Sequence, residues 1–117
     1  MILRATLALL LLLASPVAAE EWKALTGDQI KTALTARVLG YPDGKTQNFH
    51  ADGGTLYDGG GSSQSGQWRV EGDRYCSVWP PSDRWSCYGV EAEAGGLDIR
   101  FVSEGGSATT GRYIDLQ

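Results

Sequence analysis

The stretch GQWRVEGDRYCSVWPPSDRWSCYGV, residues 66–90, decides the fold because it holds three predicted strands joined by two short connections. Polar and apolar residues alternate over 67–70, and a Glu-Gly-Asp turn leads from there into a second strand over 74–79. After a Pro-Pro loop the chain returns as a third strand over 84–93. Consecutive strands with tight connections are typical of an antiparallel meander, so the sequence predicts a mainly β fold.

The two cysteines of the chain, Cys76 and Cys87, lie on the second and third of these strands. If residues 80–83 form the loop, Trp79 lies opposite Arg84, and the same register places Cys76 directly opposite Cys87. Opposed residues of a non-hydrogen-bonded pair come close enough for a disulfide. We therefore predict one disulfide in this hairpin and an oxidising compartment in which it persists.

The same register gives the hairpin aromatic side chains on both faces. It pairs Tyr75 with Tyr88 on the face that also carries Trp79, and it pairs Val78 with Trp85 on the other face. One face must pack against the core, whereas the other is either covered by a helix or exposed for binding. Trp79, Trp85 and Tyr88 are therefore candidate binding residues, and core packing is the alternative that the pattern leaves open.

Outward from this stretch, residues 26–36 have a helical pattern. Thr26 is a good N-cap, and Ile30, Ala33 and Leu34 recur at helical spacing on one face. A helix this short needs tertiary packing to persist. We expect it to cover one end of a barrel or to lie on a sheet.

The remaining segments complete the predicted fold. Leu97, Ile99 and Phe101 alternate with polar residues, so all three are expected to face the core. We expect turns at 41–44 and 51–54, mobile small-residue loops at 58–65 and 105–111, and further strands at 45–50, 55–57, 97–101 and, to close the fold, 112–116. The predicted fold is a small antiparallel β-meander, either a lipocalin-like barrel or a half-barrel, with one short N-terminal helix.

The N-terminus has the composition of a cleavable signal peptide. One basic residue, Arg4, precedes an apolar run over 5–14, and residues 17–19 supply the small side chains of a cleavage site. The apolar run is shorter than the roughly 20 residues of a membrane span. We therefore predict a signal peptide over 1–19, a single β-rich domain over 20–117, a periplasmic or secreted location, and no stable membrane span after cleavage.

The charge of the chain argues against nucleic acid as a partner. Without Arg4, nine basic and fourteen acidic side chains leave a net charge of −5, and no run of like charges occurs. Binding to nucleic acid or to an anionic membrane surface needs clustered Lys and Arg. The expected partner is therefore an unknown protein or a small-molecule ligand.

Residues suited to catalysis are few. His50 is the one histidine, and it lies beside a turn, whereas the serines of residues 62–65 belong to a Gly-Ser segment of the kind that forms surface loops. We therefore predict no catalytic residue. An enzyme would need a carboxylate such as Asp73 or Asp83 to act beside an aromatic cleft.

Residues suited to metal binding also have a simpler explanation. Asp43, Asp52 and Asp58 each precede a glycine, which is the preference of tight turns, and their spacing matches no calcium-binding loop. A zinc site would need several His or free Cys ligands, and both cysteines are predicted to be bonded to each other. We therefore predict neither a metal ion nor a cofactor.

The ordered set of motifs resembles a family of small exported bacterial domains of unknown function. A Gly-X-Trp strand at 66–68 is followed by a Gly-Asp turn at 72–73 and by Cys76 and Cys87 on consecutive strands. The resemblance covers about residues 25–92. It implies the β fold, the disulfide and export, and it implies no activity.

A second resemblance concerns the segment Ser65-Gly66-Gln67-Trp68. It is similar to the Ser-Gly-X-X-aromatic loop of periplasmic lysozyme inhibitors, which are small disulfide-bonded β-barrels whose Ser-bearing loop enters the lysozyme cleft. Ser65 and Gly66 match that motif, whereas the aromatic residue, which is Trp68 in place of the more usual tyrosine, comes one position earlier than in the motif. The resemblance implies that Ser65 and Gly66 contact a partner enzyme.

The sequence therefore supports three functions in descending order. The first is an exported, non-enzymatic binding or interaction module that uses Trp79, Trp85 and Tyr88. The second is an inhibitor of a cell-wall enzyme such as lysozyme, which would use Ser65 and Gly66. The third is an enzyme.

Overall fold

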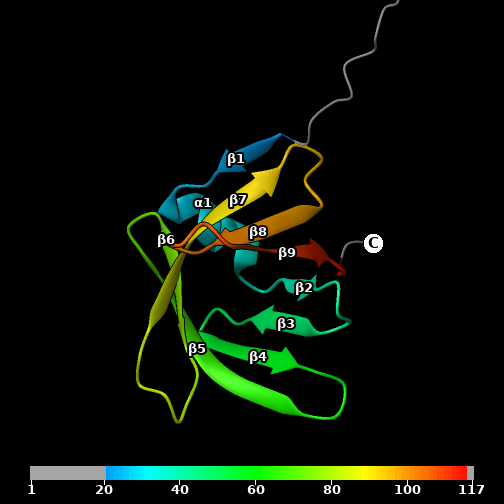
Figure 1. The fold of residues 1–117 in the computed structure, drawn as a ribbon, viewed down its shortest axis with the longest axis vertical. Helices are drawn as coiled ribbons and strands as arrows, with labels where there is room; N and C mark the ends of the chain where they lie inside the picture. Colours follow the sequence, from blue (N-terminus) through cyan, green and yellow to red (C-terminus); the bar gives the residue numbers. More distant parts are fainter. Residues whose placement is uncertain (1–20, 116–117) are drawn as a thin grey trace, which may run out of the picture.

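A computed structural model describes residues 21–115, in which eight strands close into an antiparallel barrel (Figure 1). The barrel strands are β2 (Val38–Gly40), β3 (Thr46–Phe49), β4 (Gly54–Asp58), β5 (Ser63–Glu71), β6 (Arg74–Val78), β7 (Ser86–Glu93), β8 (Asp98–Val102) and β9 (Ala108–Tyr113). The prediction of a mainly β fold is confirmed, and the barrel is closed rather than half-open. The signal peptide predicted over 1–19 lies outside the described residues.

Closure depends on strands that are far apart in the sequence. Each strand from β2 to β9 pairs with the next, and β9 then pairs with β2 through Leu39 opposite Tyr113 and Gly40 opposite Arg112. A ninth strand, β1 (Trp22–Ala24), lies outside this cycle and pairs with residues 91–93 of β7. Within residues 21–115 no helix has the length and apolarity needed to cross a bilayer.

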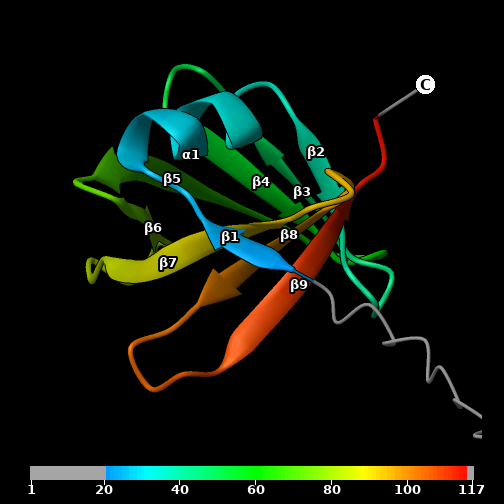
Figure 2. The same cartoon turned by 90° about the horizontal axis from the view of Figure 1, so that it is seen from above.

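The helix α1 (Gly27–Leu34) lies across one end of the barrel (Figure 2). It begins with a capping box, in which the Thr26 hydroxyl accepts from the backbone N–H of Gln29 and the Gln29 side chain accepts from that of Thr26. Ile30 and Leu34 are fully buried. The prediction of a Thr26-capped helix that covers the end of a barrel is confirmed, although the helix ends before residue 36.

Two hydrogen bonds attach α1 to the barrel at its two ends. The backbone N–H of Gly27 donates to the carboxylate of Asp73, in the turn between β5 and β6, at 2.8 Å. The hydroxyl of Tyr113 donates to the backbone oxygen of Ala33 at 2.6 Å. These bonds satisfy backbone groups at the helix ends that the helix itself leaves unpaired.

The core lies inside the barrel beneath α1, and Phe49 is at its centre. Phe49 is fully buried, and its ring meets those of Trp68 and Tyr75 edge-to-face, with centroids 5.7 and 5.9 Å apart, and stacks on Phe101 at 6.4 Å. The rest of the buried interior cluster consists of Ile30, Leu34, Leu39, Val90 and Ile99. Four aromatic rings therefore form the centre of a core that is otherwise aliphatic.

The predicted disulfide and its register are confirmed. Cys76 is bonded to Cys87, and the β6–β7 ladder pairs Tyr75 with Tyr88 and Ser77 with Ser86. The ladder ends there, so the predicted opposition of Val78 and Trp85 is not part of it.

Several predicted boundaries are wrong because backbone pairing continues where side chains are small. The predicted loop over 58–65 is shorter, since β5 already begins at Ser63 and pairs with β4. The predicted loop over 105–111 contains most of β9, which pairs with β8 from Ala108 onward. Ladder hydrogen bonds use backbone groups and do not require apolar side chains. The closing strand therefore lies at 108–113 rather than 112–116.

The strand predicted over 97–101 was expected to turn three residues toward the core, and two of them are buried there. Ile99 and Phe101 are buried, at 2% and 7% exposure, whereas Leu97 is 45% exposed. Leu97 precedes β8 and belongs to its connection with β7. The alternation therefore holds only within the strand itself.

Candidate ligand cavity

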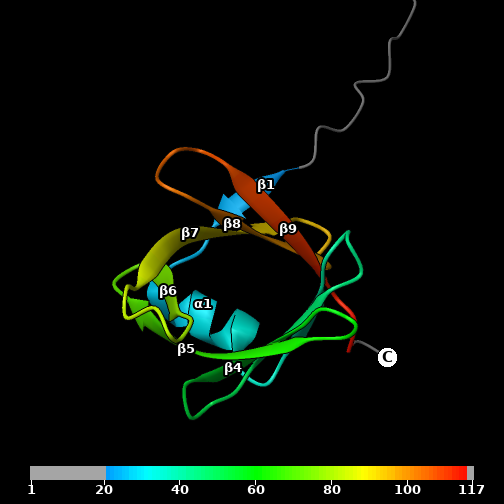
Figure 3. The same ribbon diagram turned by 60° about the horizontal axis from the view of Figure 1, so that its bottom comes forward.

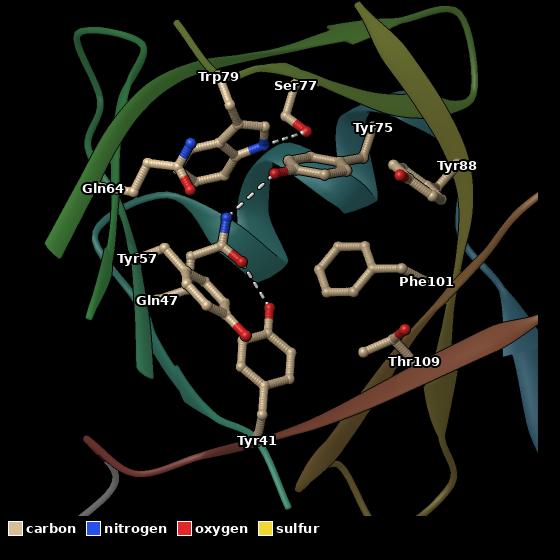
Figure 4. A pocket seen from close by; sticks show the side chains of 10 residues that line it. All are labelled: Tyr41, Gln47, Tyr57, Gln64, Tyr75, Ser77, Trp79, Tyr88, Phe101 and Thr109. Atoms are coloured by element: carbon tan, nitrogen blue, oxygen red, sulfur yellow. Dashed lines mark hydrogen bonds between the residues drawn. The ribbon is translucent and has the colours of Figure 1, made fainter. Parts of the chain in front are cut away.

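The barrel is open at the end opposite α1 (Figure 3). The connections at this end span residues 41–45, 59–62, 79–85 and 103–107. Inside it lies a cavity of about 430 Å³, within the usual range of small-ligand sites. Its walls carry six aromatic and four polar side chains: Tyr41, Tyr57, Tyr75, Trp79, Tyr88, Phe101, Gln47, Gln64, Ser77 and Thr109 (Figure 4).

Strand periodicity explains why these side chains gather. Successive side chains of a strand point to opposite faces, so Tyr75, Ser77 and Trp79 share the inner face of β6 and its extension. In β5, Gln64 lines the cavity and Trp68, four residues further on, lies in the core. The same inward-facing rows thus form the core near α1 and the cavity wall near the open end.

A buried glutamine connects the polar groups at the base of the cavity. The Gln47 side chain is 5% exposed, and its oxygen accepts from the Tyr41 hydroxyl at 2.6 Å. Its amide nitrogen donates to the hydroxyls of Thr55 and Tyr75, at 3.0 and 3.2 Å. The indole N–H of Trp79 donates to Ser77 at 3.3 Å. Every buried side-chain polar atom of the described residues has a partner, so the base is pre-organised.

The phenols at the base are held in their neutral form. Burial raises the pKa of Tyr41 well above its usual value near 10, and the neighbouring Tyr75 adds to this effect. Burial also raises the pKa of Tyr75, although its hydrogen bonds with Ser77 and Gln47 oppose the shift. Both hydroxyls therefore remain protonated across the physiological pH range, Tyr41 as a donor to Gln47 and Tyr75 as an acceptor from it.

This protonation predicts a loss of stability in alkali. The folded state holds the Tyr41 and Tyr75 protons more tightly than the unfolded chain, so their contribution to the free energy of unfolding is fully present below pH 10 and is lost as the pH rises further. Urea denaturation between pH 8 and pH 11 measures the effect. Tyr41→Phe should give a shallower fall than wild type, and an identical fall in both proteins would contradict the assignment.

The ring of Trp79 packs directly against Gly66, where there is no room for a side chain. A Cβ at Gly66 would lie 2.6 Å from the carbonyl oxygen of Val78 and 2.7 Å from Cε3 of Trp79. Trp79 also meets the ring of Tyr57 edge-to-face, with centroids 6.2 Å apart. Gly66 therefore allows the indole to lie against β5 and form the cavity wall.

Gly66→Ala is expected to lower the free energy of unfolding by about 1–3 kcal/mol, because the backbone of Val78 must move as well as the indole. Urea denaturation followed by tryptophan fluorescence measures both the stability and the displacement of Trp79. Gly89→Ala is the matched control, because its Cβ would meet only the oxygen of Val102 at 3.9 Å. Equal stability of the two variants would show that the close approach at Gly66 is unimportant.

The structure brings together some of the sequence-predicted site residues and separates others. Trp79 and Tyr88 line the cavity together, and Gly66 lies behind Trp79. Trp85 lies outside the barrel, where the guanidinium of Arg69 sits 3.8 Å from its ring centroid. Ser65 is exposed within strand β5, where it pairs with Leu56, rather than in a loop.

The carboxylates have structural partners. Asp43, Asp52 and Asp58 each accept a backbone N–H two residues further on, as turn residues do. Asp73 accepts from the N-terminus of α1, and Asp83 is exposed in the connection between β6 and β7. None of these carboxylates lines the aromatic cavity.

Glu71 lies close to the disulfide on the outside of the barrel. Its carboxylate is 3.1 Å from Sγ of Cys76 and 3.5 Å from Sγ of Cys87, and it pairs with Arg69 at 3.2 Å. Among the described residues, Glu71, Cys76 and Cys87 are the one group of potential ligands close enough together to share a metal ion. The two sulfurs, however, are bonded to each other. The disulfide therefore leaves the carboxylate alone as a ligand.

Sequence reasoning missed most of the cavity. Six residues that line it were not predicted as site residues, since each lies on a separate segment of the chain: Tyr41, Gln47, Tyr57, Gln64, Phe101 and Thr109. The sequence did contain one sign of the cavity, because two glutamines share a strand face with a buried aromatic residue. Gln47 is two residues before Phe49, and Gln64 is four residues before Trp68. A polar residue in an inward row is a candidate for a cavity wall.

Comparison with protein-family models, with curated proteins and with solved structures finds no match to this chain.

Proposed function

We propose that this protein is an exported, non-enzymatic binding module that holds a small uncharged ligand in the open end of its barrel. The observation that carries the proposal is the cavity itself, which is concave, has mostly aromatic walls and has a polar base whose groups are already paired. A site of this kind binds by burying apolar surface, and no bond in the ligand need be broken for it to do so.

The absence of charge in the walls supports an uncharged ligand. The described residues that line the cavity include no Lys, Arg, His, Asp or Glu. At the mouth, Lys45 lies 5.7 Å from the ring centroid of Tyr57, but it also pairs with Asp43 at 3.7 Å. A charged ligand would lose hydration on entering without gaining a counter-charge, which is costly.

Export is supported by two features. The disulfide between Cys76 and Cys87 is of a kind that persists in oxidising compartments such as the periplasm or the extracellular space. The N-terminal segment has the basic, apolar and small-residue order of a signal peptide. Mass spectrometry of the protein recovered from the exporting cell tests this proposal, and a mass that includes residues 1–19 would contradict it.

Filling the cavity is expected to abolish ligand binding. Thr109 faces inward at the open end of β9, whereas Thr110 faces outward on the same strand, so Thr109→Trp and Thr110→Trp form a matched pair. The neutral dye N-phenylnaphthylamine, which fluoresces in apolar sites, serves as the probe. Binding to wild type and to Thr110→Trp, with at least a tenfold loss in Thr109→Trp, is expected. Equal binding by all three proteins, or none, would contradict the cavity as the site.

Inhibition of lysozyme, which rests on Ser65 and Gly66, is tested separately with the purified domain in a lysozyme activity assay. Full lysozyme activity in the presence of micromolar domain would remove it.

A further inference from the structure

The polar side chains at the base of the cavity are hydrogen-bonded to one another, whereas those at its rim are not. Tyr57, Gln64, Tyr88 and Thr109 each present a hydroxyl or amide at the open end, from β4, β5, β7 and β9 respectively. Within residues 21–115 none of these four side chains donates or accepts a hydrogen bond. Figure 4 shows them around the same opening. The rim thus offers neutral hydrogen-bonding groups from several directions at once.

The walls between these groups are aromatic. Trp79 and Tyr57 meet edge-to-face on one side, and on the other side Tyr88 and Phe101 pack against Tyr75 at the base, with ring centroids 6.2 and 5.0 Å from it. Such walls accept a flat apolar surface. A ligand that satisfies both features must carry apolar faces and, around its edge, several uncharged groups that both donate and accept.

We infer that the ligand is a neutral polyhydroxylated ring compound of the saccharide class. This inference rests on the proposed function and names its ligand. A sugar ring has apolar C–H faces that pack on aromatic side chains and hydroxyls at its perimeter that suit Tyr57, Gln64 and Tyr88. A purely aliphatic ligand would cover these rim groups without pairing them, which costs free energy. An anionic ligand would find no cation in the walls.

The experiment is calorimetric titration of the domain with a panel of neutral mono- and disaccharides, alongside N-phenylnaphthylamine. At least one neutral saccharide is expected to bind, and its acidic counterpart, a uronic acid, is expected to bind at least tenfold more weakly. Dye binding without any saccharide binding would overturn the saccharide inference while leaving the cavity as a binding site. Binding of neither would overturn both proposals.

Variants at the rim separate saccharide binding from mere filling of the cavity. Gln64→Leu and Tyr88→Phe each remove polar groups without reducing the cavity, so each is expected to weaken saccharide binding about 3–10-fold, the range of one hydrogen bond. Dye binding should be unchanged. Gln67→Leu, on the outer face of the same strand as Gln64, is the control. Unchanged saccharide affinity in both rim variants would overturn the inference.

Discussion

Phe49→Ala is expected to lower the free energy of unfolding by about 3–5 kcal/mol, a large share of the 5–15 kcal/mol that stabilises an ordinary domain. Phe49 is fully buried, and its ring is surrounded by those of Trp68, Tyr75 and Phe101. Truncation would remove all three ring contacts and leave a void. Closed barrel strands on either side limit how far the surroundings can collapse into that void.

Urea denaturation at neutral pH measures this effect, and Phe49→Leu is the control that keeps most of the volume. The leucine variant is expected to lose markedly less stability than the alanine variant. Because Tyr75 and Phe101 also line the cavity, the alanine variant should in addition bind N-phenylnaphthylamine with altered affinity. A loss below about 1 kcal/mol would mean that Phe49 is not the centre of the core.

Removal of the disulfide is expected to have the second-largest effect. In the double variant Cys76→Ser with Cys87→Ser, the free energy of unfolding should fall by about 3 kcal/mol, the loop-closure value for a short loop. For a domain of this size, the melting temperature should drop by about 10 °C or more. The β6–β7 ladder has few other supports, because it comprises three residue pairs and Cys76 opposite Cys87 is the middle one.

Calorimetry with and without a thiol reductant checks this second prediction. Reductant should destabilise the wild-type protein to about the level of the double variant, and it should leave the double variant unchanged. Ser86→Ala, an exposed change next to Cys87 in the same strand, should leave the melting temperature within about 2 °C of wild type. A double variant as stable as wild type would show that the ladder alone secures these strands.

Those parts of the fold that depend on local chemistry could be predicted from the sequence. The cap at Thr26, the turns at 41–44 and 51–54, and the register of Cys76 opposite Cys87 each follow from residues close together in the chain. The face shared by Tyr75, Tyr88 and Trp79 was also predicted as a unit. The sequence left open whether that face is core or binding surface, and it is interior: Tyr75 is core, and all three line the cavity.

Features that depend on distant partners could not be predicted. The strand over Val38–Gly40 has three residues and no alternation, and it is a strand because β3 and β9 pair with it on its two sides. Gly111 was assigned to a loop, whereas it faces inward where a Cβ would lie 3.1 Å from the ring of Tyr41. Gln47 is buried because Tyr41, Thr55 and Tyr75 satisfy its amide. None of these partners is its neighbour in sequence.

The pairing of β9 with β2 has a consequence for the order in which the molecule is made. α1 and β2 emerge early during synthesis or translocation, but Leu39 meets its partner only when Tyr113 has also emerged. Every shorter chain has two unpaired sheet edges, which favour association with other chains. Hairpins between neighbouring strands can form earlier, because seven of the eight pairings around the barrel join strands that are consecutive in the chain. The barrel is therefore expected to close, and its two sheet edges to be covered, only when its last strand has been delivered.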